Sequence, residues 1–276
     1  MRTEKLFWKA VTYILLAIML VVALFPVYWI FVTSLKNNAE IYSLVPSMWP
    51  KEPTTQGYTD LIEKTDFLLW LRNSTIVSLT VSIVSVSVSA VAAYGLARFR
   101  FRGGQMVGSL ILVAYLLPPT LLFIPLYVLL TNIGLTGTIL SLILVYPTIT
   151  TPYATWVLTT YFRGLPPDFE EAAMIDGCSR LQALWYVTLP IASPGVIATF
   201  IFAFTLCWSE FLYALVIADS ASTTISVGLS GLIIADIFRW NEIMAGAIIT
   251  SVPVVILYSL ASRYIVSGLT LGGTKG

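Results

Sequence analysis

Few side chains in this 276-residue sequence can carry out acid–base or nucleophilic chemistry. Histidine is absent, which removes imidazole acid–base catalysis, Ser-His-Asp and Cys-His triads, and zinc sites with imidazole ligands. The two cysteines, Cys178 and Cys207, are too few for a multi-thiolate metal site or a disulfide framework. The sequence also lacks a Gly-rich phosphate loop of the P-loop type, so we expect no nucleotide cofactor in this chain. A protein without catalytic residues of its own is therefore expected.

Polar side chains inside apolar stretches are the remaining candidates for a functional role. Glu210 stands alone within such a stretch, next to Trp208 and Ser209, and an intramembrane carboxylate usually faces the protein interior or a watery cavity. It either anchors a neighbouring helix through hydrogen bonds or lines a substrate path together with Trp208. Four serines recur at spacings of four, three and four residues, which places them on one helix face: Ser78, Ser82, Ser85 and Ser89. A stripe of small residues lets two helices pack closely, which is the favoured interpretation. Alternatively, the stripe forms a polar wall of a transport pathway, for which Ser85 and Ser89 are the candidates.

The composition identifies the elements that must position these residues. Apolar residues make up 58% of the chain and charged residues 11%, where a soluble domain carries roughly 25% charged residues. The net charge of +1 provides no basic surface for nucleic acid. We therefore expect an all-α integral membrane protein in contact with lipid.

Uncharged runs of about 20 residues predict six transmembrane helices. The stretch from Gly103 to Phe162 would be about 90 Å long as one helix, far more than a bilayer needs, so a turn is expected at 131–137, where two glycines cluster. The expected spans are approximately 10–33, 73–97, 106–130, 138–161, 191–218 and 243–263, all within a single transmembrane domain covering residues 1–276.

The distribution of Lys and Arg sets the expected orientation. Ten of them lie on the side of the two termini and five on the other side, so both termini are expected in the cytoplasm. The first apolar run is too long for a signal peptide and lacks an A-x-A cleavage pattern, so it is expected to remain as an anchor. A multi-pass membrane protein with both termini in the cytoplasm is the resulting expectation.

The cytoplasmic segment 163–190 has the pattern of two short helices joined by a glycine. Asp168 is expected to cap the first helix, with Glu171 completing a capping box, and Gly177 to end it. Ser179 and Gln182 repeat the capping pattern for the second helix, which Pro190 is expected to stop. A rigid unit of this kind is suited to pushing against a soluble partner.

This segment resembles the EAA loop of permease subunits from binding-protein-dependent ABC importers. Its variant Ile175-Asp176-Gly177 is similar to the carbohydrate branch, as are Asn73-Ser74, the segment 93–99 and Trp208-Ser209-Glu210-Phe211. The resemblance extends over nearly the whole chain and is strongest to the smaller permease of the maltose type. Two positions depart from the family pattern, with Cys178 in place of the usual Ala and Ser209 in place of the usual Asn. The residues that would couple to the ATPase are Glu171, Ala172, Ala173, Asp176, Gly177, Leu189 and Pro190.

The resemblance implies a location in the bacterial or archaeal cell (inner) membrane and a set of partners. This chain would pair with a sister permease in a heterodimer, bind two copies of an ABC ATPase subunit, and receive a sugar from an extracytoplasmic solute-binding protein. ATP and Mg would be bound by the ATPase subunits. Closure of the ATPase dimer would move the coupling helices together and switch the pore from inward-open to outward-open.

Two alternatives remain open from the sequence. Within the family, the substrate is expected to be a di- or oligosaccharide, and a polyol, glycerol phosphate or modified sugar is the alternative. Outside the family, an ion-coupled secondary transporter is the rival, although Glu210 alone provides few ionisable groups for ion coupling.

Overall fold

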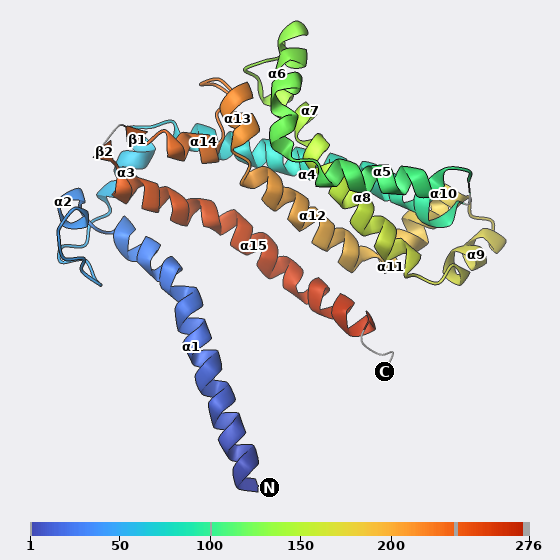
Figure 1. The fold of residues 1–276 in the computed structure, drawn as a ribbon, viewed down its shortest axis with the longest axis horizontal. Coiled ribbons are helices and arrows are strands. Elements are labelled where there is room, and N and C mark those ends of the chain that lie inside the picture. The colour runs from blue at the N-terminus through green and yellow to red at the C-terminus, as the bar shows by residue number, and fades with distance from the viewer. Residues whose placement is uncertain (1, 100, 235–236, 273–276) are drawn as a thin grey trace. The chain divides into compact units, whose positions relative to one another are not determined.

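The computed structural model describes residues 2–99, 101–234 and 237–272, and its elements are almost all helices (Figure 1). Three helices are long and apolar enough to cross a bilayer: α1 (Arg2–Ser34), α4 (Phe67–Arg98) and α15 (Trp240–Gly272). The chain forms two compact units, one from the residues up to Phe67 with Leu229–Val252, and one from Leu68–Gly228 with the residues from Pro253 onward.

The first unit combines α1 with short elements. No residue in the most apolar 18-residue stretch of α1 is buried within the chain, so lipid or a partner subunit must cover this helix. The short helices are α2 (Asn38–Ile41) and α3 (Gln56–Glu63). Gly57 of α3 lies against Asn241 of α15, and a Cβ atom added to Gly57 would be only 2.8 Å from the carbonyl oxygen of Asn241. The expected all-α class has one small exception, an antiparallel pair of two-residue strands, β1 (Ile233–Ile234) and β2 (Ile237–Phe238).

The second unit is a helical bundle in which α8 packs against both α5 and α12. Two apolar cores hold it together, one around Leu142 and Tyr146 and the other around Leu158 and Phe162. Its elements, besides α4, are α5 (Gly104–Leu116), η1 (Pro119–Leu121), α6 (Phe123–Asn132), α7 (Ile139–Val145), α8 (Pro147–Arg163), α9 (Asp168–Ile175), α10 (Arg180–Ala183), η2 (Leu184–Thr188), α11 (Leu189–Ile191), α12 (Ser193–Trp208), α13 (Leu212–Ile217) and α14 (Ile225–Ser230).

Three of the expected spans are divided in the structure. The stretch 106–130 breaks between α5 and α6, because Pro118 and Pro119 offer no N–H and cannot continue the helix. The stretch 138–161 divides at Tyr146, where Pro147 begins α8, and the stretch 191–218 divides at 209–211. Prolines alone do not decide the outcome, since Pro152 lies inside the continuous helix α8.

The predicted turn between α6 and α7 is present. Gly134 and Gly137 both have positive φ angles, of 70° and 76°, which explains why the glycines cluster there. Figure 1 shows that α9 and α10 lie at one end of the second unit, whereas α13 and α14 lie toward its other end. The loop that resembles an EAA loop therefore lies at one end of the second unit.

Candidate functional site

The segment 163–190 forms the expected helix, glycine and second helix, and Gly177 shapes its turn. Gly177 has φ +95°, and its N–H bonds to the carbonyl of Met174 at 3.1 Å. The N–H of Cys178 bonds to the carbonyl of Ala173 at 3.0 Å, so the two bonds complete a Schellman motif at the end of α9. The backbone therefore leaves α9 in a fixed direction.

The second helix begins as predicted, but the first does not. The Ser179 hydroxyl oxygen accepts a bond from the backbone N–H of Gln182, and the Gln182 side-chain oxygen accepts one from the backbone N–H of Ser179, so a capping box is present. The expectation for Asp168 is wrong: α9 starts at Asp168 itself, after Pro167, and no side chain caps it. The reason is that Pro167 takes the position before the first turn, so Asp168 already belongs to the helix.

Pro190 does not stop the second helix. The chain continues from α10 through η2, which has π-helical bonding, into α11, where Pro190 lies in the first turn. Proline is tolerated there because the first N–H groups of a helix have no partner within it. The break comes at Ala192, and the stretches Arg180–Ile191 and Ser193–Trp208 meet at 82°.

Most of the residues assigned to coupling lie on the surface of this loop. Glu171, Ala172, Asp176, Gly177 and Pro190 are exposed, and Ala173 and Leu189 are half-buried.

Five large apolar side chains are exposed on the same loop, and Ile175 is 86% exposed. An exposed patch of this kind typically marks an interaction surface. We call it the loop patch, and it consists of Phe169, Ile175, Leu181, Trp185 and Tyr186.

A buried ion pair that sequence reasoning missed fastens this loop to α4. Arg98 Nε lies 3.0 Å from both carboxylate oxygens of Glu170, and its Nη2 lies 2.8 Å from Oε1. The same Nη2 donates to the carbonyl of Leu165, and the Thr188 hydroxyl donates to Glu170 Oε1 at 2.9 Å. Glu170 is only 5% exposed. The end of α4, the start of α9 and η2 therefore meet at one carboxylate.

The serine stripe of α4 is buried against threonines of α8. Ser85 and Thr150 share a hydrogen bond of 2.7 Å, and Thr155 donates to Ser89 at 3.0 Å. Neither Ser85 nor Ser89 has any exposed surface. Within this chain both serines serve helix packing, since no open surface reaches them.

The candidates at the break between α12 and α13 have separate surroundings. Trp208 is buried and stacks on Phe204, with ring centroids 5.3 Å apart, and exposed Ser209 donates to the carbonyl of Thr205. The Glu210 carboxylate accepts bonds from the backbone N–H groups of Tyr213 at 2.9 Å and Ala214 at 3.1 Å. Glu210 thus accepts hydrogen bonds from backbone N–H groups in the first turn of α13 that have no partner within the helix. The sequence analysis had not considered this local role.

Asn73 and Ser74, part of the resemblance, fasten the loop that follows α13. Asn73 donates to the carbonyls of Ala221 and Thr223, each at 3.0 Å, and Ser74 accepts from the N–H of Ile225. Within this loop, hydrogen bonds from Ser222 lower the pKa of the Asp219 carboxyl.

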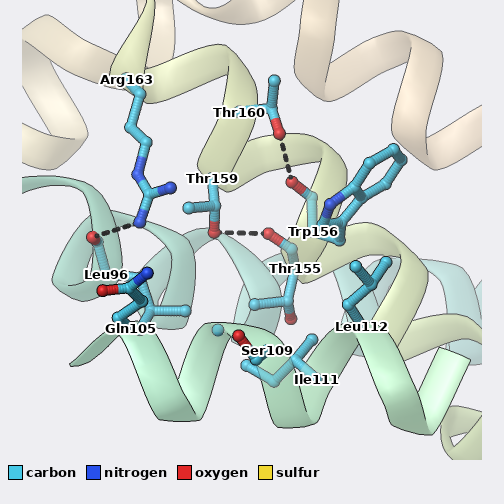
Figure 2. A pocket seen from close by; sticks show the side chains of 11 residues that line it. Leu96, Gln105, Ser109, Ile111, Leu112, Thr155, Trp156, Thr159, Thr160 and Arg163 are labelled. Carbon is cyan, nitrogen blue, oxygen red and sulfur yellow. Dashed lines mark hydrogen bonds between the residues drawn. The ribbon is translucent and has the colours of Figure 1, made fainter. Parts of the chain in front are cut away.

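A pocket of about 210 Å³ lies between α5 and α8 (Figure 2). Trp156, Gln105 and Arg163 line it. Arg163 donates to the carbonyl of Leu96 at 3.3 Å, a bond drawn as a dashed line in Figure 2. The threonine hydroxyls of Thr159 and Thr160 bond to carbonyls of α8 itself. Arg163, Thr159 and Thr160 are hydrogen-bonded within the chain, so they do not single out a ligand.

Comparisons with known proteins agree with this architecture. Residues 85–270 match the family described as binding-protein-dependent transport system inner membrane component. The inner membrane ABC transporter permease protein YcjP of Escherichia coli (strain K12) is 38% identical, covering 95% of this chain and 94% of that protein. The trehalose/maltose transport system permease protein MalG of Thermococcus litoralis (strain ATCC 51850 / DSM 5473 / JCM 8560 / NS-C) is 32% identical, covering 100% of both chains.

A solved structure shares the fold. In the crystal structure of a bacterial ABC transporter involved in import of the acidic polysaccharide alginate, one chain aligns with a TM-score of 0.80 and 21% identity. The alignment covers 96% of this chain and 98% of that one.

Proposed function

Because this chain belongs to the family of binding-protein-dependent transport system inner membrane components, we propose that it forms half of the translocation pore of an ATP-driven carbohydrate importer. Members of this family are membrane subunits without catalytic activity of their own. The observation that carries the proposal is the loop patch, which stands on a rigid turn at one end of the second unit.

The loop 163–190 acts as the coupling element in this proposal. A protein partner that covers Ile175 and its apolar neighbours would remove their surface from water, which stabilises docking. The partner is an ATPase subunit that binds ATP and Mg, and two copies of it serve this chain and a sister permease. The Arg98–Glu170 ion pair transmits movement of α9, caused by the ATPase subunit, to α4.

Six membrane crossings fit this assignment. α1, α4 and α15 cross as single helices, and the divided stretches 106–130, 138–161 and 191–218 cross as broken ones. A broken helix is tolerated at membrane depth where protein or a watery cavity surrounds the interruption. Both termini then lie in the cytoplasm, on the side of the coupling loop.

The substrate class follows from relatives. The relative MalG is named for trehalose and maltose, and it matches this chain over its full length. We therefore assign a di- or oligosaccharide as the substrate, delivered by an extracytoplasmic solute-binding protein.

Site-directed cross-linking tests the docking. Ile175→Cys, in a Cys178→Ser background, should form a disulfide-length cross-link to a cysteine on the ATPase subunit in the assembled complex. Thr55→Cys is the matched control, because Thr55 is also exposed but lies on the opposite side in the proposed topology. Cross-linking from position 55, or its absence from position 175 in an assembled complex, would contradict the coupling role.

A further inference from the structure

A pocket of about 260 Å³ lies entirely within the first unit, where the end of α1 meets the segment around α2 and the start of α15. The residues that line it include Trp29, Thr33, Lys36, Glu40, Trp240 and Met244. Sites for drug-sized ligands typically have volumes of about 300–1,000 Å³. This smaller pocket therefore suits a compact polar group more than a whole disaccharide.

The pocket holds one positive and one negative side chain in fixed positions. Lys36 is only 3% exposed, and its Nζ donates to the carbonyl of Ser47 at 2.5 Å and lies 4.8 Å from the centre of the Trp29 ring. The hydroxyl of the same serine donates to the Glu40 carboxylate, which also accepts from the backbone N–H of Lys51. The serine bond, the backbone bond and the charge of Lys36 lower the pKa of the Glu40 carboxyl, so it is ionised at neutral pH. A ligand that matches both side chains carries a negative and a positive group.

The Thr33 hydroxyl is a separate indication of a polar ligand. Thr33 lines the pocket and is 7% exposed, and its Oγ1 has no hydrogen-bond partner among the residues that the structure describes. Thr12 on the same helix, in contrast, donates to the carbonyl of Trp8 at 2.8 Å. Buried hydroxyls are almost always hydrogen-bonded, because burying one without a partner costs free energy. The Thr33 hydroxyl is thus available to a group that enters the pocket.

Two tryptophans place the pocket at a membrane surface. Trp29 lies five residues before the end of α1, and Trp240 is the first residue of α15. Both helices are long and apolar enough to cross a bilayer, and tryptophan is enriched where such helices meet the lipid headgroups. The Trp240 ring stacks on Phe238 with centroids 5.2 Å apart, and the Tyr42 hydroxyl donates to the carbonyl of Phe238 at 2.7 Å. In the proposed topology, this surface is the outer one.

An uncovered apolar face of α1 continues from the pocket toward the bilayer interior. Phe25 stacks on Trp29, with ring centroids 6.0 Å apart. Val22 and Ile18 follow at spacings of three and four residues, so they lie on the same face as Phe25. All three side chains are exposed. A ligand with its polar group in the pocket can lay a hydrocarbon chain along this face, whereas a free sugar or a soluble ion would leave the face uncovered.

We propose that this pocket binds the headgroup of phosphatidylethanolamine, a zwitterionic phospholipid. The phosphate accepts hydrogen bonds from the Lys36 ammonium and the Thr33 hydroxyl. The ethanolamine ammonium binds the Glu40 carboxylate and the face of the Trp240 ring, and an acyl chain follows Phe25 along α1. Phosphatidylcholine has no N–H to donate to Glu40, and phosphatidylglycerol has no positive group. Only the choice of the outer leaflet rests on the proposed function.

Photo-cross-linking of the assembled importer in detergent tests the site. The probe is phosphatidylethanolamine with a diazirine in one acyl chain. Its cross-links should map to α1 around Phe25, and excess unlabelled phosphatidylethanolamine should reduce them at least about fivefold more than the same excess of phosphatidylglycerol or phosphatidylcholine. Equal competition by either of these lipids, displacement by maltose, or cross-links only elsewhere would overturn the proposal.

Thr33→Val separates lipid binding from a structural role. The substitution replaces the hydroxyl with a methyl group of similar shape, and the hydroxyl has no partner in the described chain. A purely structural role therefore predicts unchanged or higher thermal stability and unchanged cross-linking. The proposal predicts that cross-linking falls about fivefold, which corresponds to about 1 kcal/mol. Thr12→Val is the matched control on the same helix and should cross-link as the wild type does.

Substitutions of Lys36 test the charge. Lys36→Met keeps an unbranched side chain and should lower cross-linking about tenfold, whereas Lys36→Arg should restore most of it. Lys64→Met is the control, because Lys64 lies on α3 outside the pocket and pairs with Asp60. Wild-type cross-linking in Thr33→Val or Lys36→Met would refute the site. A wild-type importer that binds the lipid but carries none of a panel of disaccharides would instead contradict the proposed function.

Discussion

Gly177 sets the direction in which the chain leaves α9, through a φ of +95° that other residues adopt only with strain. A Cβ added at Gly177 would meet no atom within 4 Å, so a substitution there acts through the backbone and not through a clash within the chain.

Gly177→Val should therefore uncouple transport from ATP hydrolysis while the complex still assembles. The left-handed conformation costs a β-branched residue at least about 1–2 kcal/mol, enough to change the turn without unfolding the bundle. The measurement is the ratio of sugar transported to ATP hydrolysed in proteoliposomes. Gly103→Val is a matched control, with a φ of +90° and equally open surroundings outside α9. An unchanged ratio in Gly177→Val, or an equal loss in both variants, would refute the role of this turn.

Glu210 has a local hydrogen-bonding role in the structure, which predicts an effect on assembly. Glu210→Ala leaves the N–H groups of Tyr213 and Ala214 without their acceptor and should cost about 0.5–2 kcal/mol, as loss of a helix cap does. The amount of assembled complex should fall, while the apparent affinity of the surviving fraction for sugar stays the same. Glu210→Gln keeps one acceptor and should assemble better. A shifted affinity in Glu210→Gln at normal assembly would show contact with the sugar instead.

At the scale of elements, the buried Arg98–Glu170 pair links the loop to the bundle. Removing one partner of a buried pair leaves an uncompensated charge, which typically costs about 3–5 kcal/mol. Glu170→Ala should therefore lower both the thermal stability of the complex and its transport. Asp60→Asn, which breaks the more exposed Lys64–Asp60 pair of α3, should cost at most about 1 kcal/mol.

The comparison of these two variants by thermal unfolding in detergent checks the prediction. Equal, small losses would mean that Glu170 does not fasten the loop. A large loss of stability with an unchanged transport-to-ATP ratio in the remaining complex would assign Glu170 to folding alone.

The elements that the sequence predicted well depend on local signals. Ser179 with Gln182 marked a helix start, Gly134 and Gly177 marked turns, and the serine spacing on α4 marked a buried face. These features depend on residues within one or two turns of each other, so spacing alone reveals them.

The features that the sequence missed depend on residues far apart in the chain or on competing local effects. Arg98 and Glu170 are 72 residues apart, and nothing in their spacing indicates that they pair. Hydropathy located the apolar stretch 106–130 but not its break, because proline can either kink or interrupt a helix depending on packing.

At the scale of the whole molecule, the proposed topology predicts which loops are accessible from each side. A cysteine introduced at Thr55 should react with impermeant thiol reagents from outside, and one at Gln105 only from inside, because Lys and Arg favour the cytoplasmic side. Both positions are exposed in the structure, so a lack of reaction would not result from burial within the chain. Opposite labelling would reverse the orientation, and labelling of both from one side would contradict the number of crossings.

The assignment as an ATP-driven importer subunit is tested most directly by sugar uptake under two energy sources. Proteoliposomes that hold this chain, its sister permease and the ATPase should accumulate maltose or trehalose when the binding protein is outside and ATP is inside. We predict that uptake stops when ATP is depleted, even with ion gradients maintained, and that it also stops without the binding protein. Sustained uptake on an ion gradient in the absence of ATP would contradict this account and identify an ion-coupled transporter.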